Sequence, residues 1–190
     1  MERIVFKVPK TMLSQLDEIG IDPGKVDYLG LSHLHIDHVG NLDLLPSATV
    51  LLQEAEYAAG FGPNPEELTL MPESYAALNG ENVRTVEGDH DVFGDGTVVL
   101  TPLPGHTPGH QGLLLRLRDT GPILLAGDVS YSAKDYADGA VRTSNVDLAQ
   151  SARSIEAAKG LERDVGAAVW LLHHDRDAQR DIFCAPYSYD

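Results

Sequence analysis

Apolar positions along the chain form short continuous runs that alternate with amphipathic stretches, each bounded by glycine, proline or aspartate. Short apolar runs predict buried strands, and apolar residues at every third or fourth position predict helices. We therefore expect strands at 28–31, 49–53, 97–101, 112–117, 123–126 and 167–172, and helices at 11–19, 54–59 and 146–161. The proline-rich stretch 60–72 predicts a loop. Strands mixed with helices in this order predict an α/β protein with helices packed outside sheets.

Composition narrows the class of protein. The 190 residues show no internal repeat or linker, so we expect one domain over residues 1–190. A net charge of −15 argues against a nucleic-acid partner, because a phosphate backbone is bound by basic surfaces. Cys184, the single cysteine, can form no internal disulfide. The sequence shows neither a membrane-length apolar run nor the features of a signal peptide, so we expect a cytoplasmic protein without a membrane partner.

The run HLHIDH at positions 33–38 directly follows a predicted strand and carries the strongest chemical signal. Residues two apart point to the same side in an extended segment but about 200° apart in a helix. An extended segment would aim His33, His35 and Asp37 in one direction, with His38 one step further on. Imidazoles with a carboxylate suit Zn²⁺ better than Mg²⁺ or Ca²⁺, which prefer oxygen ligands. Four candidate ligands in six residues predict two metals.

Four motifs in order, HLHIDH, LPGHTPGH, LLAGDVSY and WLLHHD, resemble those of the metallo-β-lactamase superfamily. The resemblance implies an αββα sandwich with two Zn²⁺ ions, or other divalent transition metals, at one edge. It implies one metal held by His33, His35 and His106, a second held by Asp37, His38 and His174, and Asp128 shared between them. Two cations held by these residues would activate a bridging hydroxide and polarise a substrate carbonyl.

Within that superfamily the chain resembles the N-acyl-homoserine lactonases. The resemblance rests on EGD at 87–89, TPLPGHTPGHQGLLL at 101–115 and GDVSY at 127–131. It implies a small-molecule lactone or ester as substrate, Asp37 and Asp128 in the catalytic centre, and a hydrogen bond from Tyr131 to the lactone. The alternatives are a thioesterase of the glyoxalase II kind, a phosphodiesterase, or a catalytically weak, truncated metal-binding protein.

The remaining histidines are expected to have lesser roles. His110 would orient the ligand loop through hydrogen bonds, and His90 would be a solvated turn residue. His173 competes with His174 for the last ligand position, because neighbours in a strand point to opposite faces. We favour His174, because the superfamily places this ligand immediately before an aspartate. The apolar residues of 61–75 predict core packing under a loop, with an acyl-chain groove as the alternative.

One departure from the superfamily concerns the first part of the sheet. Members carry several strands before the histidine-rich motif, whereas His33 stands near the start of this sequence. We therefore expect a sandwich that lacks the N-terminal strands of one sheet. A truncated gene, a minimal natural form and a homo-oligomer in which a second copy covers the incomplete sheet are the alternatives. An open apolar sheet is an aggregation liability, so we expect association or instability in preference to a stable monomer.

Overall fold

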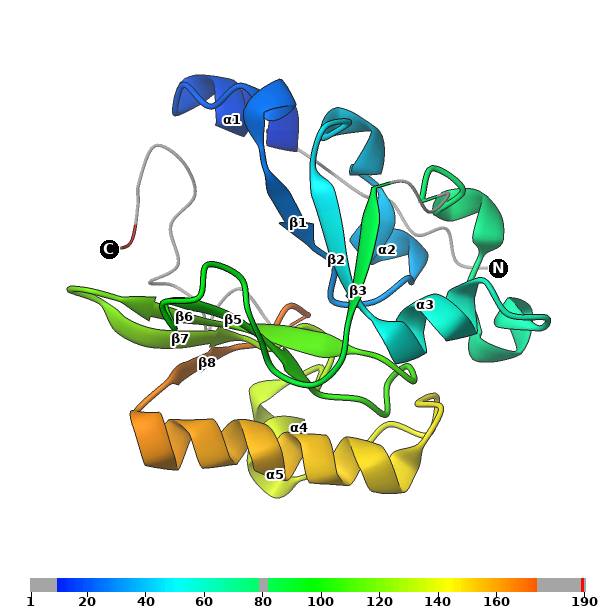
Figure 1. Ribbon diagram of the computed structural model, residues 1–190. Helices are drawn as coiled ribbons and strands as arrows, with labels where there is room; N and C mark the ends of the chain where they lie inside the picture. The colour runs from blue at the N-terminus through cyan, green and yellow to red at the C-terminus, as the bar shows by residue number, and fades with distance from the viewer. Residues whose placement is uncertain (1–9, 79–81, 174–188, 190) are drawn as a thin grey trace.

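The computed structural model describes residues 10–78, 82–173 and 189, which form two β-sheets that face each other with helices outside (Figure 1). The three-stranded sheet has the order β1-β2-β3, and all its strands are parallel. The five-stranded sheet has the order β4-β5-β6-β7-β8, antiparallel except for the parallel pair β7 and β8. This arrangement confirms the predicted α/β sandwich.

The elements have the following bounds. The strands are β1 (Tyr28–Gly30), β2 (Thr49–Gln53), β3 (Val83–Val86), β4 (His90–Asp91), β5 (Val98–Pro102), β6 (Gln111–Leu117), β7 (Gly121–Leu125) and β8 (Ala168–Trp170). The helices are α1 (Met12–Glu18), α2 (Ile36–Val39), α3 (Glu54–Gly60), α4 (Ala133–Asp138) and α5 (Leu148–Val165), with short 3₁₀ turns between several of them.

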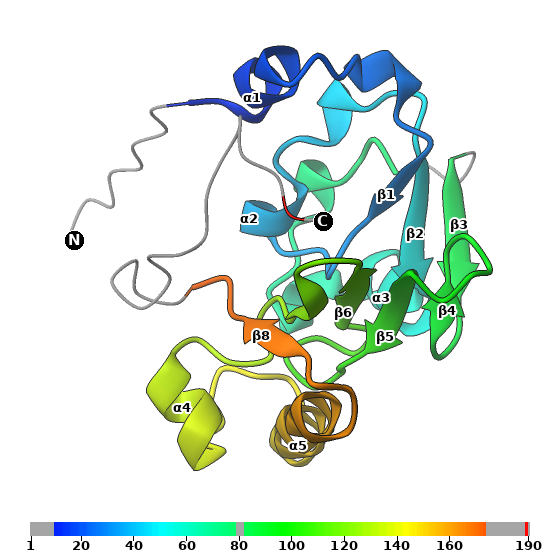
Figure 2. The ribbon, with the colours of Figure 1, turned by 90° about the vertical axis from the view of Figure 1, so that its left-hand side faces the viewer.

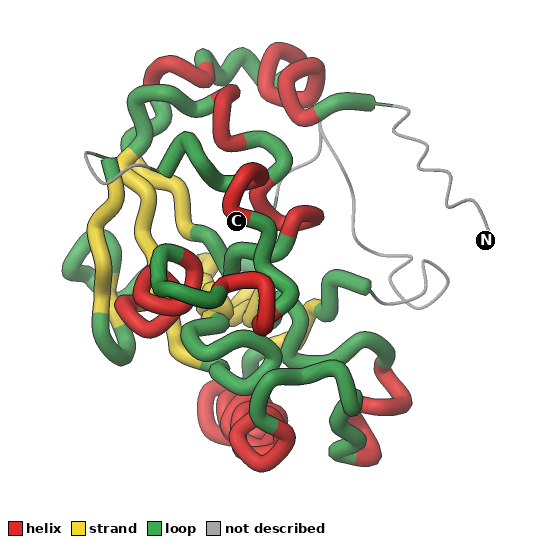
Figure 3. The backbone as a smooth tube through the Cα atoms, turned by 90° about the vertical axis from the view of Figure 1, so that its right-hand side faces the viewer, coloured by secondary structure: helices red, strands yellow, loops and turns green. Residues whose placement is uncertain are grey.

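The outer helices cover opposite layers (Figures 2 and 3). Helix α3 packs against β2 and β3, whereas α5 packs beneath β7 and β8. Helix α5 begins after Asp147, whose carboxylate accepts a hydrogen bond from the Gln150 backbone N–H at 2.8 Å. It ends at Gly166, which adopts the left-handed conformation. These two caps shift the helix relative to the predicted range of 146–161.

Four helices and strands were not predicted from the sequence, namely α2, β3, β4 and α4. Strand β4 contains His90, so the expectation of a solvated turn residue was wrong; its ring is half-buried and the residue pairs with Leu100 of β5. The polar stretch around it carries no alternating apolar pattern. Pairing with a neighbouring strand, which sequence alone does not reveal, creates this element.

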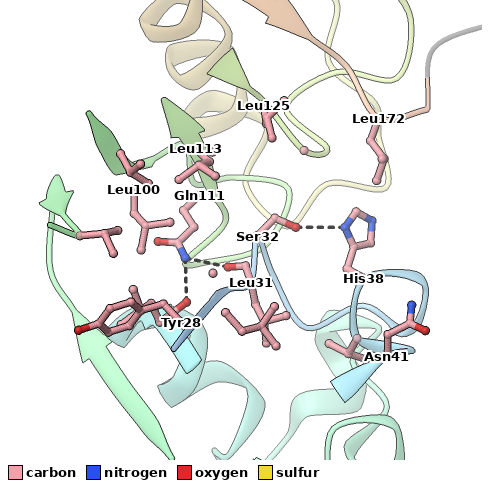
Figure 4. Close-up of a pocket in the computed structure, with 18 of the residues that line it drawn as sticks. Tyr28, Leu31, Ser32, His38, Asn41, Leu100, Gln111, Leu113, Leu125 and Leu172 are labelled. Carbon is pink, nitrogen blue, oxygen red and sulfur yellow. Dashed lines mark hydrogen bonds between the residues drawn. The ribbon is translucent and has the colours of Figure 1, made fainter. Parts of the chain in front are cut away.

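Among the described residues, the apolar packing between the sheets is incomplete. The buried cluster there consists of Leu51, Val86 and Leu100, with the partly buried Val92 and Leu113 against it. A cavity of about 650 Å³, lined mainly by leucine and valine, lies beside this cluster (Figure 4). The buried Gln111 amide bridges the layers by donating to the carbonyl oxygens of Leu31 (2.7 Å) and Leu51 (3.2 Å).

Strand β1 forms one edge of the three-stranded sheet: among the described residues it pairs with β2 alone. An exposed strand edge beside an apolar cavity favours strand addition. The expected homo-oligomer stays a prediction. Light scattering of the purified chain with two equivalents of Zn²⁺ should show a particle larger than one chain, and a monodisperse monomer would contradict it.

No helix in the described part of the chain combines the length and apolarity needed to cross a bilayer.

Candidate metal centre

The histidine-rich segment leaves β1 at the edge where the two sheets meet. The chain leaves β1 without regular secondary structure, bends at Ser32 and reaches His35, whose backbone is extended (φ −67°, ψ 150°) and which precedes α2. The His33 and His35 rings point to the same side, as the period of two predicted, because Nε2 of His33 lies 2.9 Å from Nδ1 of His35. The period of two does not continue to Asp37 and His38, which lie in the single turn of α2. A hydrogen bond from the His38 backbone N–H to the His35 carbonyl (2.9 Å) closes this turn and brings both side chains back toward the centre.

Three imidazoles converge at the first part of the centre. The Nε2 atom of His33 lies 2.9 Å from Nδ1 of His35, which lies 3.0 Å from Nε2 of His106. These three atoms all lie within 4.8 Å of one another, and we call the three residues the first group. The structure thus brings together the three residues predicted to hold one metal.

The opposite nitrogen of each ring in the first group has its own polar contact. Nδ1 of His33 lies 3.1 Å from the Ser32 hydroxyl, and Nδ1 of His106 lies 3.1 Å from Oδ1 of Asn145. Nε2 of His35 lies 2.9 Å from the Thr69 hydroxyl, which itself donates to the Leu68 carbonyl. The Asn145 oxygen can only accept, so Nδ1 of His106 donates and Nε2 presents its lone pair to the centre.

Sequence reasoning missed Ser32, Thr69 and Asn145. Each approaches its histidine through the tertiary fold or an adjacent turn, and none belongs to a ligand motif. Thr69 lies 34 residues from the ring it contacts and has a left-handed backbone (φ 60°) that is uncommon for a β-branched residue. An unusual backbone at a ring contact is the only local signal, and it is visible only in coordinates.

Two carboxylates and two imidazoles form the second part of the centre. Asp37, His38 and His173 place one ligand atom each within 4.8 Å of the others, and we call them the second group. Asp128 lies between the groups, with one carboxylate oxygen 3.4 Å from Nε2 of His38 and the other 3.4 Å from Nε2 of His106 and of His173. This position between the groups is the one expected of a shared carboxylate.

The predicted last ligand, His174, lies outside the described residues. The described neighbour, His173, is the residue that reaches the centre, with its Nε2 3.5 Å from Oδ2 of Asp37. Strand β8 ends at Trp170, so the alternation of a strand does not extend to the histidine pair. The choice of His174 therefore stays a prediction.

Two buried polar atoms of the centre make no well-formed hydrogen bond with any described residue. They are Nε2 of His38 and Oδ1 of Asp128, which face each other at 3.4 Å. Leaving such atoms unpaired costs about 1–3 kcal/mol each. A divalent cation would satisfy both atoms, and a set of imidazoles with carboxylates is the donor set that Zn²⁺ and similar transition metals prefer. The side chains present therefore fit a metal centre.

The electrostatics favour the same conclusion. Burial lowers the pKa of His33, His35 and His106, so these rings are neutral near pH 7. Burial acts to raise the pKa of Asp128, but the His38 and His106 imidazoles outweigh it and hold that pKa well below its ordinary value. Metal binding requires neutral imidazoles and ionised carboxylates. The folded chain thus holds the His33, His35 and His106 imidazoles neutral and the Asp128 carboxylate ionised near pH 7.

His110 acts as predicted, through hydrogen bonds. Its ring is fully buried, Nδ1 donates to the Leu103 carbonyl at 2.9 Å, and Nε2 accepts from the Asp128 backbone N–H at 2.9 Å. This pairing fixes the neutral tautomer and positions the backbone of Asp128.

The pH dependence of stability should reflect this ring. Burial lowers the pKa of His110 from 6.5 to about 3, so the unfolded chain takes up a proton that the folded chain does not. The free energy of unfolding should therefore decrease as the pH is lowered from about 6.5 toward about 3. Relative to His110→Gln, the metal-free parent should lose up to about 1.4 kcal/mol more per pH unit. Urea unfolding at pH 7, 6 and 5 measures this difference, and parallel curves for the two proteins would contradict it.

Two glycines explain how His106 enters the centre. At Gly105 (φ +126°) an added Cβ would lie 2.3 Å from the backbone nitrogen of Ser151 in α5. At Gly109 it would lie 2.2 Å from the backbone nitrogen of Glu56 in α3. Only glycine permits both approaches. The loop that carries His106 is thus held between one helix from each outer layer.

Tyr131 lies beside both groups. Its ring stacks on His173, with centroids 5.1 Å apart and an interplanar angle of 9°, and meets the His106 ring edge-on at 5.8 Å. The Arg142 guanidinium carbon lies 3.9 Å from the ring centroid. Partial burial, together with the nearby Asp128 carboxylate, raises the pKa of the phenol above its ordinary value. The hydroxyl therefore stays protonated near neutral pH and can donate a hydrogen bond.

The loop at 61–75 is largely part of the core. Leu68, Leu70 and Tyr75 pack in the cluster around β1 and β2, and the Tyr75 hydroxyl donates to the Gly60 carbonyl at 2.8 Å. Phe61 and Met71 remain exposed. Core packing, the interpretation preferred from the sequence, is confirmed for the buried Leu70 and Tyr75, against which the partly buried Leu68 packs.

Comparison with known proteins identifies the family. The family model described as the metallo-beta-lactamase superfamily matches residues 6–168. The chain belongs to the metallo-beta-lactamase superfamily. Three of the four motifs in which the resemblance was recognised, HLHIDH, LPGHTPGH and LLAGDVSY, lie within the matched residues.

Similar members of the superfamily are named as lactonases. The chain is 32% identical over 194 residues to the N-acyl homoserine lactonase AttM of Azorhizobium caulinodans, covering 98% of this chain and 72% of that protein. It is 36% identical over 121 residues to an N-acyl homoserine lactonase of a Bacillus species, covering 64% of this chain and 45% of that protein. The similarity to the lactonase branch that was recognised in the sequence is confirmed.

A solved structure of the same branch supports the fold. It is an N-acyl homoserine lactone hydrolase with the product N-hexanoyl-L-homoserine bound at its catalytic metal centre, and it superposes with a TM-score of 0.80 at 27% identity. The match covers 94% of this chain and 67% of that one. A metallo-beta-lactamase from Thermotoga maritima, 20% identical with a TM-score of 0.65, shares the fold.

Proposed function

We propose that the chain is a hydrolase that opens the lactone ring of N-acyl homoserine lactones at a dinuclear zinc centre. The convergence of the first and second groups on Asp128 is the observation that carries this proposal, because two metal sites with a shared carboxylate require it. The similarity to proteins named as N-acyl homoserine lactonases supports the choice of substrate.

The residues divide the work as follows. His33, His35 and His106 would hold one ion, Asp37, His38 and one histidine of the 173–174 pair would hold the other, and Asp128 would bridge them. When bound, the ions would supply a nucleophilic hydroxide at neutral pH and polarise the ester carbonyl. Tyr131 would donate its hydroxyl proton in a hydrogen bond to the oxygen that gains negative charge, or to the leaving alkoxide. Ser32, Thr69 and Asn145 would keep the rings oriented.

A substrate panel tests the proposed reaction against its alternatives. The zinc-loaded chain should hydrolyse an N-acyl homoserine lactone with a higher kcat/KM than a glutathione thioester or a nitrophenyl phosphodiester. Faster turnover of the thioester would instead indicate a hydrolase of the glyoxalase II kind. Elemental analysis of the same sample should give two zinc ions per chain, and one ion or none would contradict the dinuclear centre.

Two single-residue variants, compared side by side, identify the histidine that completes the second group. His173→Ala and His174→Ala should differ, because a single imidazole from this pair can complete the second group. The described geometry favours His173, and the superfamily motif favours His174. One variant should retain about two zinc ions per chain and the other about one, as measured by elemental analysis after dialysis. Equal metal content in both variants would show that neither ring is an exclusive ligand.

A further inference from the structure

A buried carboxylate outside the metal centre connects its two main loops. Glu56 lies in the first turn of α3 and its side chain is inaccessible to solvent. Its Oε1 accepts a hydrogen bond from the Leu34 backbone N–H at 3.0 Å, and its Oε2 accepts one from the Gly109 backbone N–H at 2.9 Å. Each oxygen of the carboxylate therefore accepts a backbone hydrogen bond, and the two donors come from segments that are distant in sequence.

The two donors belong to the loops that carry the first group. Leu34 stands between His33 and His35, and Gly109 stands three residues after His106. Fixing the Leu34 N–H orients the peptide unit between His33 and Leu34, because the peptide unit is planar. Fixing the Gly109 N–H restrains the loop that carries the third histidine. One carboxylate thus restrains both loops of the first group.

Close packing makes this connection short and rigid. The helix backbone at Glu56 approaches Gly109 so closely that a side chain there would collide with it. The carboxylate needs to span only the remaining gap, and it stays buried without a lysine or arginine partner among the described residues. Burying a carboxylate without a cation carries a free-energy cost. An apolar residue at position 56 could pack α3 without this cost. We therefore attribute the buried carboxylate to its hydrogen bonds with the two loops.

We propose that Glu56 is a positioning residue that holds the HLHIDH and PGHTPGH loops at the spacing required for the first group to bind a divalent metal. This inference rests on the proposed metal centre, but it does not depend on which ester the centre hydrolyses. Glu56 belongs to neither group of candidate ligands, and its contacts with the backbone of the two loops are the route by which it would act.

Cobalt binding tests the inference directly. The full chain, stripped of metal, is titrated with Co²⁺ in competition with a chelator, and the visible absorption spectrum reports ligand geometry. Glu56→Ala should weaken Co²⁺ binding about 10–100-fold, the usual effect of losing a partner outside the ligand shell. Glu56→Gln should have a smaller effect, because its amide oxygen can still accept one of the two N–H groups. Glu54→Gln, on the exposed side of the same turn, is the matched control and should leave binding unchanged.

The outcomes separate positioning from simple stabilisation. Circular dichroism and the melting temperature of the metal-free proteins are recorded alongside. Unchanged Co²⁺ affinity and spectrum in Glu56→Gln would overturn the inference, whatever the melting temperature, and this variant decides the matter if Glu56→Ala fails to fold. A parent chain that turns over lactone while the Glu56 variants bind Co²⁺ normally would refute the inference alone. A parent that binds Co²⁺ in a Glu56-dependent way but hydrolyses no lactone would refute the proposed reaction alone.

Discussion

Replacing His106 by alanine is expected to lower kcat/KM for lactone hydrolysis by about 10³-fold or more, since loss of a partner that only supports a ligand already costs about 10–100-fold. Within the described structure, His106 is the ring that the loop after β5 contributes to the first group, and its Nε2 also lies 3.4 Å from Asp128. Its removal would leave His33 and His35 without a third imidazole. The zinc content should fall together with the rate.

The control for this variant is His90→Ala, which removes an imidazole from β4, outside both groups. Initial rates, elemental analysis and circular dichroism on the parent and both variants separate loss of the centre from loss of the fold. Equal rates for the parent and His106→Ala would remove the catalytic assignment and favour a non-catalytic metal-binding protein.

Replacing Tyr131 by phenylalanine is expected to lower kcat by about 10²–10³-fold, the cost of removing one hydrogen-bond donor to a developing oxyanion. The ring would remain stacked on His173 and beneath Arg142, so the metal content and melting temperature should change little. The phenol stays protonated near neutral pH, because partial burial and the adjacent carboxylate raise its pKa. The rate should therefore fall without a new pH dependence.

Steady-state kinetics with zinc-loaded protein measure the effect, and Tyr28→Phe supplies the control, since that ring packs against Phe93, which is not part of either group. A rise in KM with kcat unchanged would show that Tyr131 shapes the substrate pocket without donating in the transition state.

The sequence predicted the parts of this molecule that depend on local chemistry. Strand β2 was predicted with its observed bounds, and the α3 and α5 helices were predicted to within a few residues. The convergence of His33, His35 and His106 was predicted from the resemblance of four ordered motifs to those of the metallo-β-lactamase superfamily. The direction of the first two rings followed from the period of an extended chain.

Other features depend on tertiary contacts that no local pattern encodes. The single turn of α2 was missed because four residues cannot show helical periodicity. Strand β4 forms through its pairing with β5, and the Thr69 contact with His35 crosses 34 residues. The sequence does not distinguish Glu56 from other acidic residues at a helix start, where acidic side chains are common. Its buried position, reached only when α3 docks, distinguishes it.

The loop between Gly105 and Gly109 has a consequence for how the molecule comes apart. It is pressed by α5 on one side and by α3 on the other, and these helices belong to opposite layers. A shift of either helix would displace the imidazole that this loop carries. Metal binding at the centre and the packing of the two layers against each other should therefore be thermodynamically linked. Metal release should weaken the packing between the layers, and separation of the layers should lower the affinity for metal.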